Sequence, residues 1–400
     1  MADVNDDGDL DILVTGFNNM RRITERIHLL EYSDSSGYSP ISGHGLPALK
    51  RPSLKFNDLD NDGDPDLLLI GDEEGEHRIT CFFNDGQGHF TEHPMEIHQF
   101  EAKNFVFIDL NGDDFDDLII SGTDRQSLGN GLFISVGKTF VYLNDQTGTL
   151  NQAVGYDFKN EKEVSYQAIN LDEDEQEELI VFGEHSIDVY KIMDGSPNLI
   201  DSNPLIWEHA EESVFEDLDR DGDMDLIIVA SYNESKDMVF YLNEGKGDFV
   251  RFNYQHFSGL SSDEIHLSKI GKGVRSLYSK NTTSTYNLLE HNYDMDFSFE
   301  TNYVEAVQGW FIEDHLFVDI DGENGDDLIL VGLKPGADRT QGYILLNDGK
   351  GNFIDNDNSF DRLSSGGIAS ADIDLDGDND ILYMGLYGSN ATSLFFMNEE

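Results

Sequence analysis

The sequence predicts an all-β protein, a single β-propeller domain of four-stranded blades that covers residues 1–400. Two phrases carry this prediction, an acidic loop and a hairpin turn, because both recur with the same period of about 53 residues, near the length of known blade repeats. About eight units of this kind favour a closed ring over an open stack of repeats, with seven blades as the alternative. The acidic phrase begins near residues 3, 58, 109, 170, 217, 269, 319 and 372.

Each period accommodates four short strands. In the second unit they are residues 53–59 before the acidic loop, 66–72 after it, 78–84 before the hairpin turn and 89–97 after it. The turn contains Asn-Asp-Gly or Asn-Glu-Gly, residues that accept the positive φ angles of tight hairpins. The first unit lacks its first strand and the last unit lacks its fourth, so we expect the chain to be part of a longer protein. The hairpin phrase begins at Phe82, Tyr142, Tyr241 and Leu345.

The acidic loop has the spacing of a cation site. Carboxylates at its positions 1, 3 and 5 converge when glycine at position 6 turns the chain sharply, while position 7 offers a backbone carbonyl and position 9 closes the shell. Hard oxygen ligands that carry three or four negative charges suit Ca²⁺, because Mg²⁺ demands a tighter octahedral geometry. The predicted calcium ligands, loop by loop, are Asp3, Asn5, Asp7, Asp9 and Asp11; Asp58, Asp60, Asp62, Asp64 and Asp66; Asp109, Asn111, Asp113, Phe115 and Asp117; Asp217, Asp219, Asp221, Asp223 and Asp225; Asp319, Asp321, Glu323, Gly325 and Asp327; and Asp372, Asp374, Asp376, Asp378 and Asp380.

The six candidate loops differ in how closely they keep this pattern. The loop at Asp109 has Asp114 where glycine is expected, and the loop at Asp319 has Glu323 and Asn324 at positions 5 and 6. Both are therefore predicted to be weaker sites. The complete loops begin at Asp3, Asp58, Asp217 and Asp372.

Two further repeats are predicted to bind no cation. The loop at Asn170 lacks glycine and ends in Glu178, and the segment at Lys269 has lost every acid. A different interpretation of all the loops is that their acids form solvated turns with local hydrogen bonds. Six loops in phase argue against it, because crowded carboxylates cost several kcal/mol when no cation neutralises them.

The composition restricts the possible partners. The chain has 80 acidic and 25 basic side chains, and its formal charge of −55 excludes direct binding to nucleic acid or to anionic membranes. No apolar run is long enough to span a bilayer, so we expect no membrane insertion, and the N-terminal segment shows no signal peptide. Cys81 stands alone, permits no internal disulfide, and lies in an apolar strand where it is expected to pack in the core.

Loops such as DLDNDGDPDLLLIG from Asp58 and DLNGDDFDDLIISG from Asp109 resemble the FG-GAP and VCBS repeats of integrin α-subunit β-propellers, and the chain looks closer to their bacterial secreted forms. The resemblance implies that the loop joins strands 1 and 2 of a blade and binds Ca²⁺ through positions 1, 3, 5, 7 and 9. It also implies an extracellular or cell-surface location. The family includes adhesion receptors, a fungal lectin and polysaccharide lyases with calcium-bearing propellers.

The sequence shows none of the usual catalytic signatures, such as HExxH, G-x-S-x-G or a phosphate-binding loop. The two tryptophans could stack on sugars. Their places in the repeat favour a different role, because large apolar residues recur there and are expected to anchor one blade against the next. These positions hold Leu49, Phe100, Trp207, Leu260, Trp310 and Leu363.

Departures from the repeat indicate where function resides. Residues 122–139 are the longest insertion, and Arg21, Arg22 and Arg26 form a rare basic cluster, both in loops expected on the face opposite the calcium loops. We interpret the chain as a calcium-binding extracellular propeller, an adhesion or ligand-binding module that binds a protein or glycan on that face without catalysis. One alternative is a polysaccharide lyase or hydrolase with its site at the mouth of the central channel. The other is a structural spacer of a larger surface protein.

Overall fold

The structure is a computed structural model. It describes residues 1–17, 25–32, 38–171, 174, 176–204, 209–219, 221–232, 235–251, 262–270, 274–281, 287–293, 299–360, 364–373, 376–387, 390–396 and 398. The positions named from the sequence that lie outside these residues are Arg21, Arg22, Trp207, Leu260, Leu363 and Asp374.

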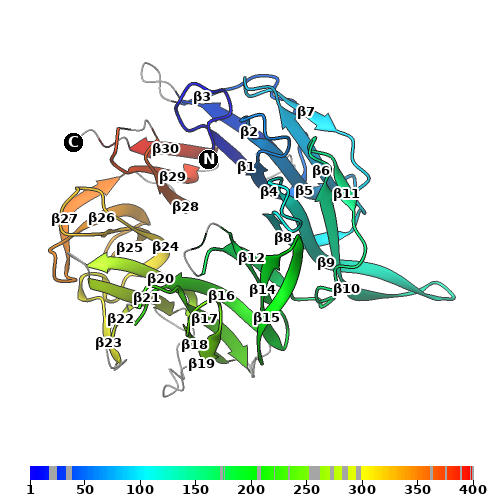
Figure 1. Cartoon of the computed structure of the whole chain (residues 1–400). Helices are drawn as coiled ribbons and strands as arrows, with labels where there is room; N and C mark the ends of the chain where they lie inside the picture. Colours follow the sequence, from blue (N-terminus) through cyan, green and yellow to red (C-terminus); the bar gives the residue numbers. More distant parts are fainter. Residues whose placement is uncertain are drawn as a thin grey trace.

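Antiparallel sheets follow one another around a ring in which each strand pairs with its neighbours in sequence (Figure 1). We number the sheets 1 to 8 in chain order. Six are four-stranded blades: β4 (Lys50–Asn57), β5 (Asp66–Glu73), β6 (Glu76–Asn84) and β7 (Phe90–His93); β8 (Glu101–Ile108), β9 (Asp117–Gly129), β10 (Leu132–Asn144) and β11 (Leu150–Gln152); β12 (Ser165–Ile169), β13 (Glu178–Phe182), β14 (Ser186–Met193) and β15 (Ser196–Pro204); β16 (His209–Glu216), β17 (Asp225–Tyr232), β18 (Ser235–Asn243) and β19 (Phe249–Arg251); β20 (Ser262–Ile270), β21 (Val274–Asn281), β22 (Asn287–Tyr293) and β23 (Phe299–Tyr303); and β24 (Phe311–Val318), β25 (Asp327–Leu333), β26 (Gln341–Asn347) and β27 (Phe353–Phe360).

Sheets 1 and 8 have three strands each. Sheet 1 contains β1 (Ile12–Phe17), β2 (Glu25–Glu31) and β3 (Ser39–Pro40), and sheet 8 contains β28 (Ser364–Ala371), β29 (Asp380–Tyr387) and β30 (Asn390–Phe396). The predicted all-β propeller is confirmed, with six four-stranded blades where the sequence predicted about eight. The missing first strand of sheet 1 and fourth strand of sheet 8 agree with the sequence pattern, as far as the described residues extend.

Sheets 1 and 8 meet and close the ring (Figure 1). The backbone N–H of Leu10, in the first acidic loop, donates a hydrogen bond of 3.2 Å to the carbonyl oxygen of Ile373 in the last one. This backbone contact joins positions that are 363 residues apart in sequence, so the two ends of the described chain are neighbours in the ring.

The second strands β5, β13 and β25 are buried on both faces along most of their length, which explains their continuous apolar sequences. Core clusters form between successive sheets. Leu49 and Phe100 are 1% and 2% exposed and lie in the clusters between sheets 1 and 2 and between sheets 2 and 3, as the repeat predicted for blade anchors. Trp310 is buried against Tyr343 of its own blade. Cys81 is fully buried in the cluster of sheets 2 and 3, and burial raises the pKa of its thiol to about 12.

Residues 122–139 were expected to form a long loop and instead extend two strands. β9 and β10 are 13 residues each, and their outer parts project beyond the ring as a two-stranded hairpin (Figure 1). Apart from strands, the described residues contain one 3₁₀ turn at Glu305–Val307, and no helix that could cross a membrane is found among them.

Candidate metal centres

Each acidic loop joins the first and second strands of its sheet, except that the loop of sheet 1 leads directly into β1 with no strand before it among the described residues. We number the loops by sheet: loop 1 (residues 3–11), loop 2 (58–66), loop 3 (109–117), loop 4 (170–178), loop 5 (217–225), loop 7 (319–327) and loop 8 (372–380). Residues of the sixth repeat near Lys269 lie in β20, and residues 271–273, which follow it, are outside the described part of the chain.

A left-handed residue at position 6 turns the loops, as predicted from their glycines. Gly63 and Gly222 have φ of 99° and 104°, and the non-glycine residues at this position, Asp114 and Asn324, adopt 67° and 64°. Aspartate and asparagine tolerate this region better than other residues with a side chain. Loops 3 and 7 therefore turn at position 6 as the glycine loops do, although their sequences depart from the pattern.

The side chain at position 1 holds this turn. In loop 2, Oδ2 of Asp58 accepts the backbone N–H of Gly63 at 3.0 Å, and in loop 3, Oδ2 of Asp109 accepts that of Asp114 at 2.9 Å. The same bond forms in loops 1, 5 and 8, where the position 1 residues are Asp3, Asp217 and Asp372.

Carboxylate oxygens converge most closely in three loops. They lie within 4.8 Å of one another in the groups Asp58, Asp60 and Asp62; Asp217, Asp219 and Asp225; and Asp319, Asp321 and Asp327. These groups comprise positions 1, 3 and 5 of loop 2 and positions 1, 3 and 9 of loops 5 and 7. The last group was predicted to be weaker from its sequence, yet its carboxylates meet as closely as those of two complete loops.

The other predicted ligands are arranged less tightly. In loops 1, 3 and 8, no three carboxylates of the described residues come within this distance. Asp374 of loop 8 lies outside the described residues. Phe115 and Gly325 lie in the same turns at position 7, which was predicted to contribute its backbone carbonyl.

The carboxylate at position 9 accepts two backbone hydrogen bonds and is also a candidate ligand. The position 9 carboxylates are at most 1% exposed, and in loop 2 Oδ2 of Asp66 accepts the N–H of Leu59 at 3.1 Å, while Oδ1 accepts the N–H of Asn84 at 2.9 Å. Equivalent pairs of bonds hold Asp11, Asp117, Asp225, Asp327 and Asp380. Each carboxylate thus ties its loop to the end of the strand that precedes the hairpin turn of its own sheet.

Burial of these carboxylates opposes their ionisation. Desolvation raises the pKa of Asp66 and Asp117 to about 7 and that of Asp11, Asp225 and Asp327 to about 6, although the two backbone hydrogen bonds act in the opposite direction. The other acids of the loop also raise the pKa. Without a bound cation, the ionised form of these carboxylates is therefore destabilised by burial and by the neighbouring acids.

The hairpin turns cover the acidic loops, which explains why the two sequence phrases keep the same period. A Cβ on Gly86 would lie 2.6 Å from Oδ2 of Asp64, and a Cβ on Gly349 would lie 3.1 Å from Oδ1 of Asn324. Glycine fits both the close approach and the positive φ of 68° at Gly86 and 75° at Gly349.

Two buried oxygens indicate that a cation fits. Oδ1 of Asp60 and Oδ1 of Asp372 are enclosed and accept no hydrogen bond within the described part of the chain. A buried carboxylate oxygen is costly unless a donor or a cation satisfies it. The donor set consists of hard oxygens with several negative charges, which is the chemistry that Ca²⁺ prefers.

Comparison with known proteins agrees with the repeat. Residues 58–120, which include loops 2 and 3, match a family model described as FG-GAP-like repeat. The chain is a β-propeller that contains FG-GAP-like repeat sequence at residues 58–120. No curated protein matches it.

Solved structures that resemble this FG-GAP propeller are distant. A lectin of Agrocybe aegerita that recognises non-reducing terminal N-acetylglucosamine is 14% identical, with a TM-score of 0.44 over 86% of this chain and 79% of that one. A putative 6-phosphogluconolactonase of Bacteroides fragilis is 14% identical, with a TM-score of 0.46 over 88% and 95%. The Tc holotoxin pore of Photorhabdus luminescens gives 13% identity and a TM-score of 0.32, covering 96% of this chain and 17% of that one.

In loop 4 of the propeller, the ammonium group of a lysine lies among the acidic side chains. Nζ of Lys191, from β14, lies 2.6 Å from Oδ2 of Asp174 and 3.1 Å from Oε1 of Glu178, which is fully buried. These acids are positions 5 and 9 of the loop, so the ammonium group lies among the side chains that would otherwise face a metal ion. The sequence predicted that this loop binds no calcium but did not identify Lys191 as the reason.

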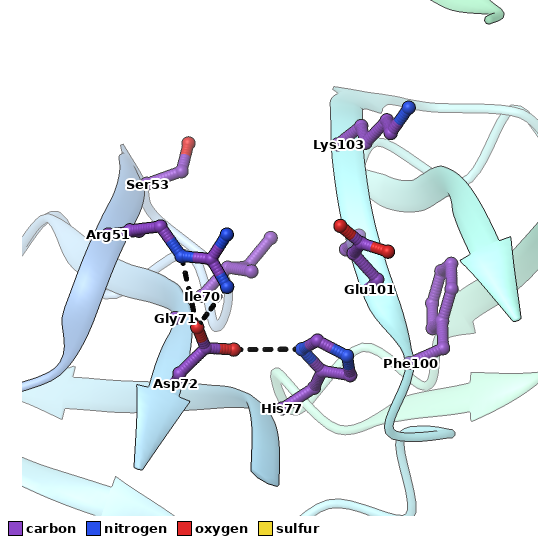
Figure 2. Close-up of a pocket in the computed structure, with 10 residues that line it drawn as sticks. Arg51, Ser53, Ile70, Gly71, Asp72, His77, Phe100, Glu101 and Lys103 are labelled. Carbon is purple, nitrogen blue, oxygen red and sulfur yellow. Dashed lines mark hydrogen bonds and ion pairs between the residues drawn. The ribbon is translucent and has the colours of Figure 1, made fainter. Parts of the chain in front are cut away.

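A polar pocket lies between sheets 2 and 3 of the propeller, and we call it the blade 2–3 pocket (Figure 2). Its volume is about 130 Å³, and it is lined by Arg51, Asp72, His77, Glu101 and Lys103 among others. These residues lie at the ends of strands remote from the acidic loops, because β4 and β8 lead into a loop and β5 leads out of one. The pocket is therefore on the face opposite the candidate metal centres.

Charged groups are paired along the sheet 2 wall of this pocket. Asp72 accepts hydrogen bonds from the guanidinium of Arg51 and lies 2.8 Å from Nδ1 of His77, and the hydrogen bond from Arg51 is the main cause that lowers the pKa of Asp72 (Figure 2). Arg51 precedes Pro52 in a β-bulge and has φ of 49°, a region that residues before proline rarely adopt. Such backbone strain is concentrated at binding sites in proteins.

Proposed function

We propose that this FG-GAP propeller is a calcium-stabilised extracellular module that binds a protein or glycan ligand and acts in adhesion. The observation that carries the proposal is loop 2, where oxygens of Asp58, Asp60 and Asp62 lie within 4.8 Å of one another and Oδ1 of Asp60 has no donor among the described residues. A divalent cation there would satisfy this oxygen and neutralise the cluster. The residues that would hold it are those of the loop itself.

Bound calcium would stabilise the folded propeller and fix the shape of the acidic loops, since the residues that bind it lie in turns that connect strands of the ring. Extracellular calcium modules commonly bind at about 10⁻⁴ to 10⁻³ M, and an ion that binds only the folded chain raises its stability by mass action. Such affinities match an extracellular setting. The ligand would then bind on the opposite face, where the blade 2–3 pocket presents donors and acceptors from five charged or ionisable side chains.

Melting curves with and without calcium test the metal part of the proposal. Chelation should lower the melting temperature of the wild-type chain, calcium should restore it, and magnesium should restore little. Asp58→Asn should reduce the calcium effect, whereas Glu96→Gln, which changes an exposed acid outside the loops, should leave it intact. A melting curve that does not move in excess chelator refutes the metal sites.

Binding arrays test the ligand part independently. The calcium-loaded chain is applied to glycan and protein arrays, and the hits are repeated with Arg51→Ala. Lys350→Ala is the matched control, because it removes an exposed cation from the hairpin turn that follows β26, on the face of the acidic loops. Loss of binding in Arg51→Ala alone supports the blade 2–3 pocket, and equal binding by both variants places the ligand elsewhere.

A further inference from the structure

The outer part of the β9–β10 hairpin is held only by its own two strands. β8 pairs with β9 as far as Thr123, and β11 pairs with β10 only at Tyr142 to Asn144. Beyond these points the ladder joins β9 to β10 alone, through pairs such as Phe133 with Ser127. A two-stranded ribbon of this kind has little stability of its own in water.

Apolar side chains gather at the end of this ribbon. We call Leu128, Leu132, Phe133 and Ile134 the hairpin tip; their exposed fractions are 58%, 64%, 52% and 42%. The guanidinium of Arg125 lies over the ring of Phe133 at 4.9 Å. Because adjacent large apolar residues are seldom left in water, such a patch marks a surface that another molecule covers.

The hairpin differs in charge from the rest of the molecule. Residues 125–138 contain Arg125 and Lys138 and no acidic residue, in a chain with 80 acids and a formal charge of −55. The tip is therefore an apolar group beside two cations, and it complements an apolar recess that has a carboxylate at its edge.

Such a recess is present on the same chain, between sheets 3 and 4. This rim hollow has a volume of about 520 Å³ and is lined by Val154, Gly155, Tyr156, Asp157, Phe158, Tyr190, Ser196, Pro197 and Leu199. Its aromatic wall is ordered, since Phe158 and Tyr190 meet edge to face at 5.3 Å. Val154 and Leu199 at its border are 92% and 54% exposed, and Asp157 supplies the carboxylate.

We propose that the hairpin tip of one copy of the chain occupies the rim hollow of a second copy. The apolar side chains of the tip would cover the aromatic wall, and Arg125 would approach the edge where Asp157 lies. The hairpin also projects beyond the ring, so the contact keeps the two acidic bodies farther apart than a face-to-face contact would (Figure 1). Repulsion between the bodies is screened beyond about 8 Å at physiological salt, so added salt should strengthen the association.

Sedimentation velocity over a series of concentrations tests the proposal with the full chain. The wild type should associate reversibly, and Phe133→Asp should weaken the association by about tenfold or more, the loss typical of a central apolar contact. Ile354→Asp is the matched control, because Ile354 is 54% exposed on β27 and far along the chain from both surfaces. Melting temperatures of the variants confirm that each is folded.

Mixing the two kinds of variant identifies the surfaces. Leu199→Asp should also abolish self-association, yet its intact tip should bind the intact hollow of Phe133→Asp, so the mixture should form heterodimers that neither variant forms alone. A wild type that is monomeric at every concentration overturns the proposal. Self-association of the Leu199→Asp variant overturns the proposal as well, since the rim hollow would then not be the surface that binds the hairpin tip. The result does not depend on calcium or on the ligand of the opposite face.

Discussion

Nδ2 of Asn84 donates a hydrogen bond of 2.8 Å to the carbonyl oxygen of Val4, a residue 80 positions earlier in the chain and in the acidic loop of the preceding sheet. The backbone N–H of Asn84 donates to Oδ1 of Asp66 in its own loop. Asn84 therefore connects two successive loops. The same bond between sheets joins Asn144 to Leu59, Asn243 to Leu171 and Asn398 to Ile320.

The residue whose carbonyl accepts this bond makes a second hydrogen bond, within its own loop. Leu59 donates its N–H to Asp66 of its own loop and accepts Nδ2 of Asn144 from the next sheet. Each loop is thus linked through its second residue to the next hairpin turn. We infer that the candidate metal centres stabilise contacts between sheets as well as the turns that contain them.

Asn144→Ala should destabilise the chain by about 2–4 kcal/mol, because it removes buried hydrogen bonds to Leu59, Gln146 and Gly148 and leaves their backbone groups without this partner. Chemical denaturation measures the change. Asn151→Ala is the control, since this exposed asparagine of the same sheet bonds within its own hairpin turn, to Thr149 and Asp145, and should change stability by less than about 0.5 kcal/mol. Similar losses in both variants would show that the bond between sheets contributes little.

The sequence was sufficient for the fold because its two phrases recur in phase, and each phrase dictates a local turn whatever the tertiary context. The partner of Asn84 could not be inferred in this way. The turn alone explains an asparagine at that place, and only the register of two neighbouring sheets brings it to Val4. Position 9 is a similar case, since its spacing predicted a ligand but not the two backbone N–H groups that donate to it.

Lys191 is another contact that the sequence pattern did not show. The missing glycine of loop 4 predicted that this loop binds no calcium. Which basic side chain pairs with Asp174 and Glu178 depends on strand register, which the sequence does not show. The repeat predicts a loop at residues 122–139, because they are its longest insertion. Cross-strand pairing extends the two strands through these residues nevertheless.

Lys191→Met should destabilise the chain by about 3 kcal/mol, because it leaves the fully buried carboxylate of Glu178 without its counter-charge. Glu178→Gln in the same chain should restore most of this loss, as both charges are then absent. Urea denaturation of the two variants at neutral pH provides the comparison. If Lys191→Met is as stable as wild type, the ammonium group does not neutralise loop 4.

The stability of the metal-free chain should fall as pH rises from about 4 to about 7. The position 9 carboxylates have an ordinary pKa of 3.8, and burial raises it to about 6 or 7 in the folded chain. Between these values the folded chain binds more protons than the unfolded chain, so its free energy of unfolding decreases with pH. Melting in chelator should therefore occur at a higher temperature at pH 5 than at pH 7.5.

Saturating calcium should remove or reverse this dependence, because protons compete with the ion for the loop carboxylates. The two pH series, with calcium and with chelator, are measured on the same preparation. A melting temperature in chelator that increases steadily up to pH 7.5 would contradict the assignment of raised pKa values to buried loop acids.

The acidic loops should differ in what they contribute to calcium stoichiometry, measured by isothermal titration. Asp58→Ala and Asp217→Ala each remove a position 1 carboxylate that both converges on the candidate site and holds the turn through position 6, so each should lose one ion. Asp172→Ala should leave the stoichiometry unchanged, because Lys191 already occupies the acids of that loop. Lys269→Ala should also leave it unchanged, since that repeat has no carboxylate to lose. An ion lost from Asp172→Ala would mean that loop 4 binds calcium in spite of Lys191, and that neither the missing glycine nor the internal cation is a valid criterion for an empty loop.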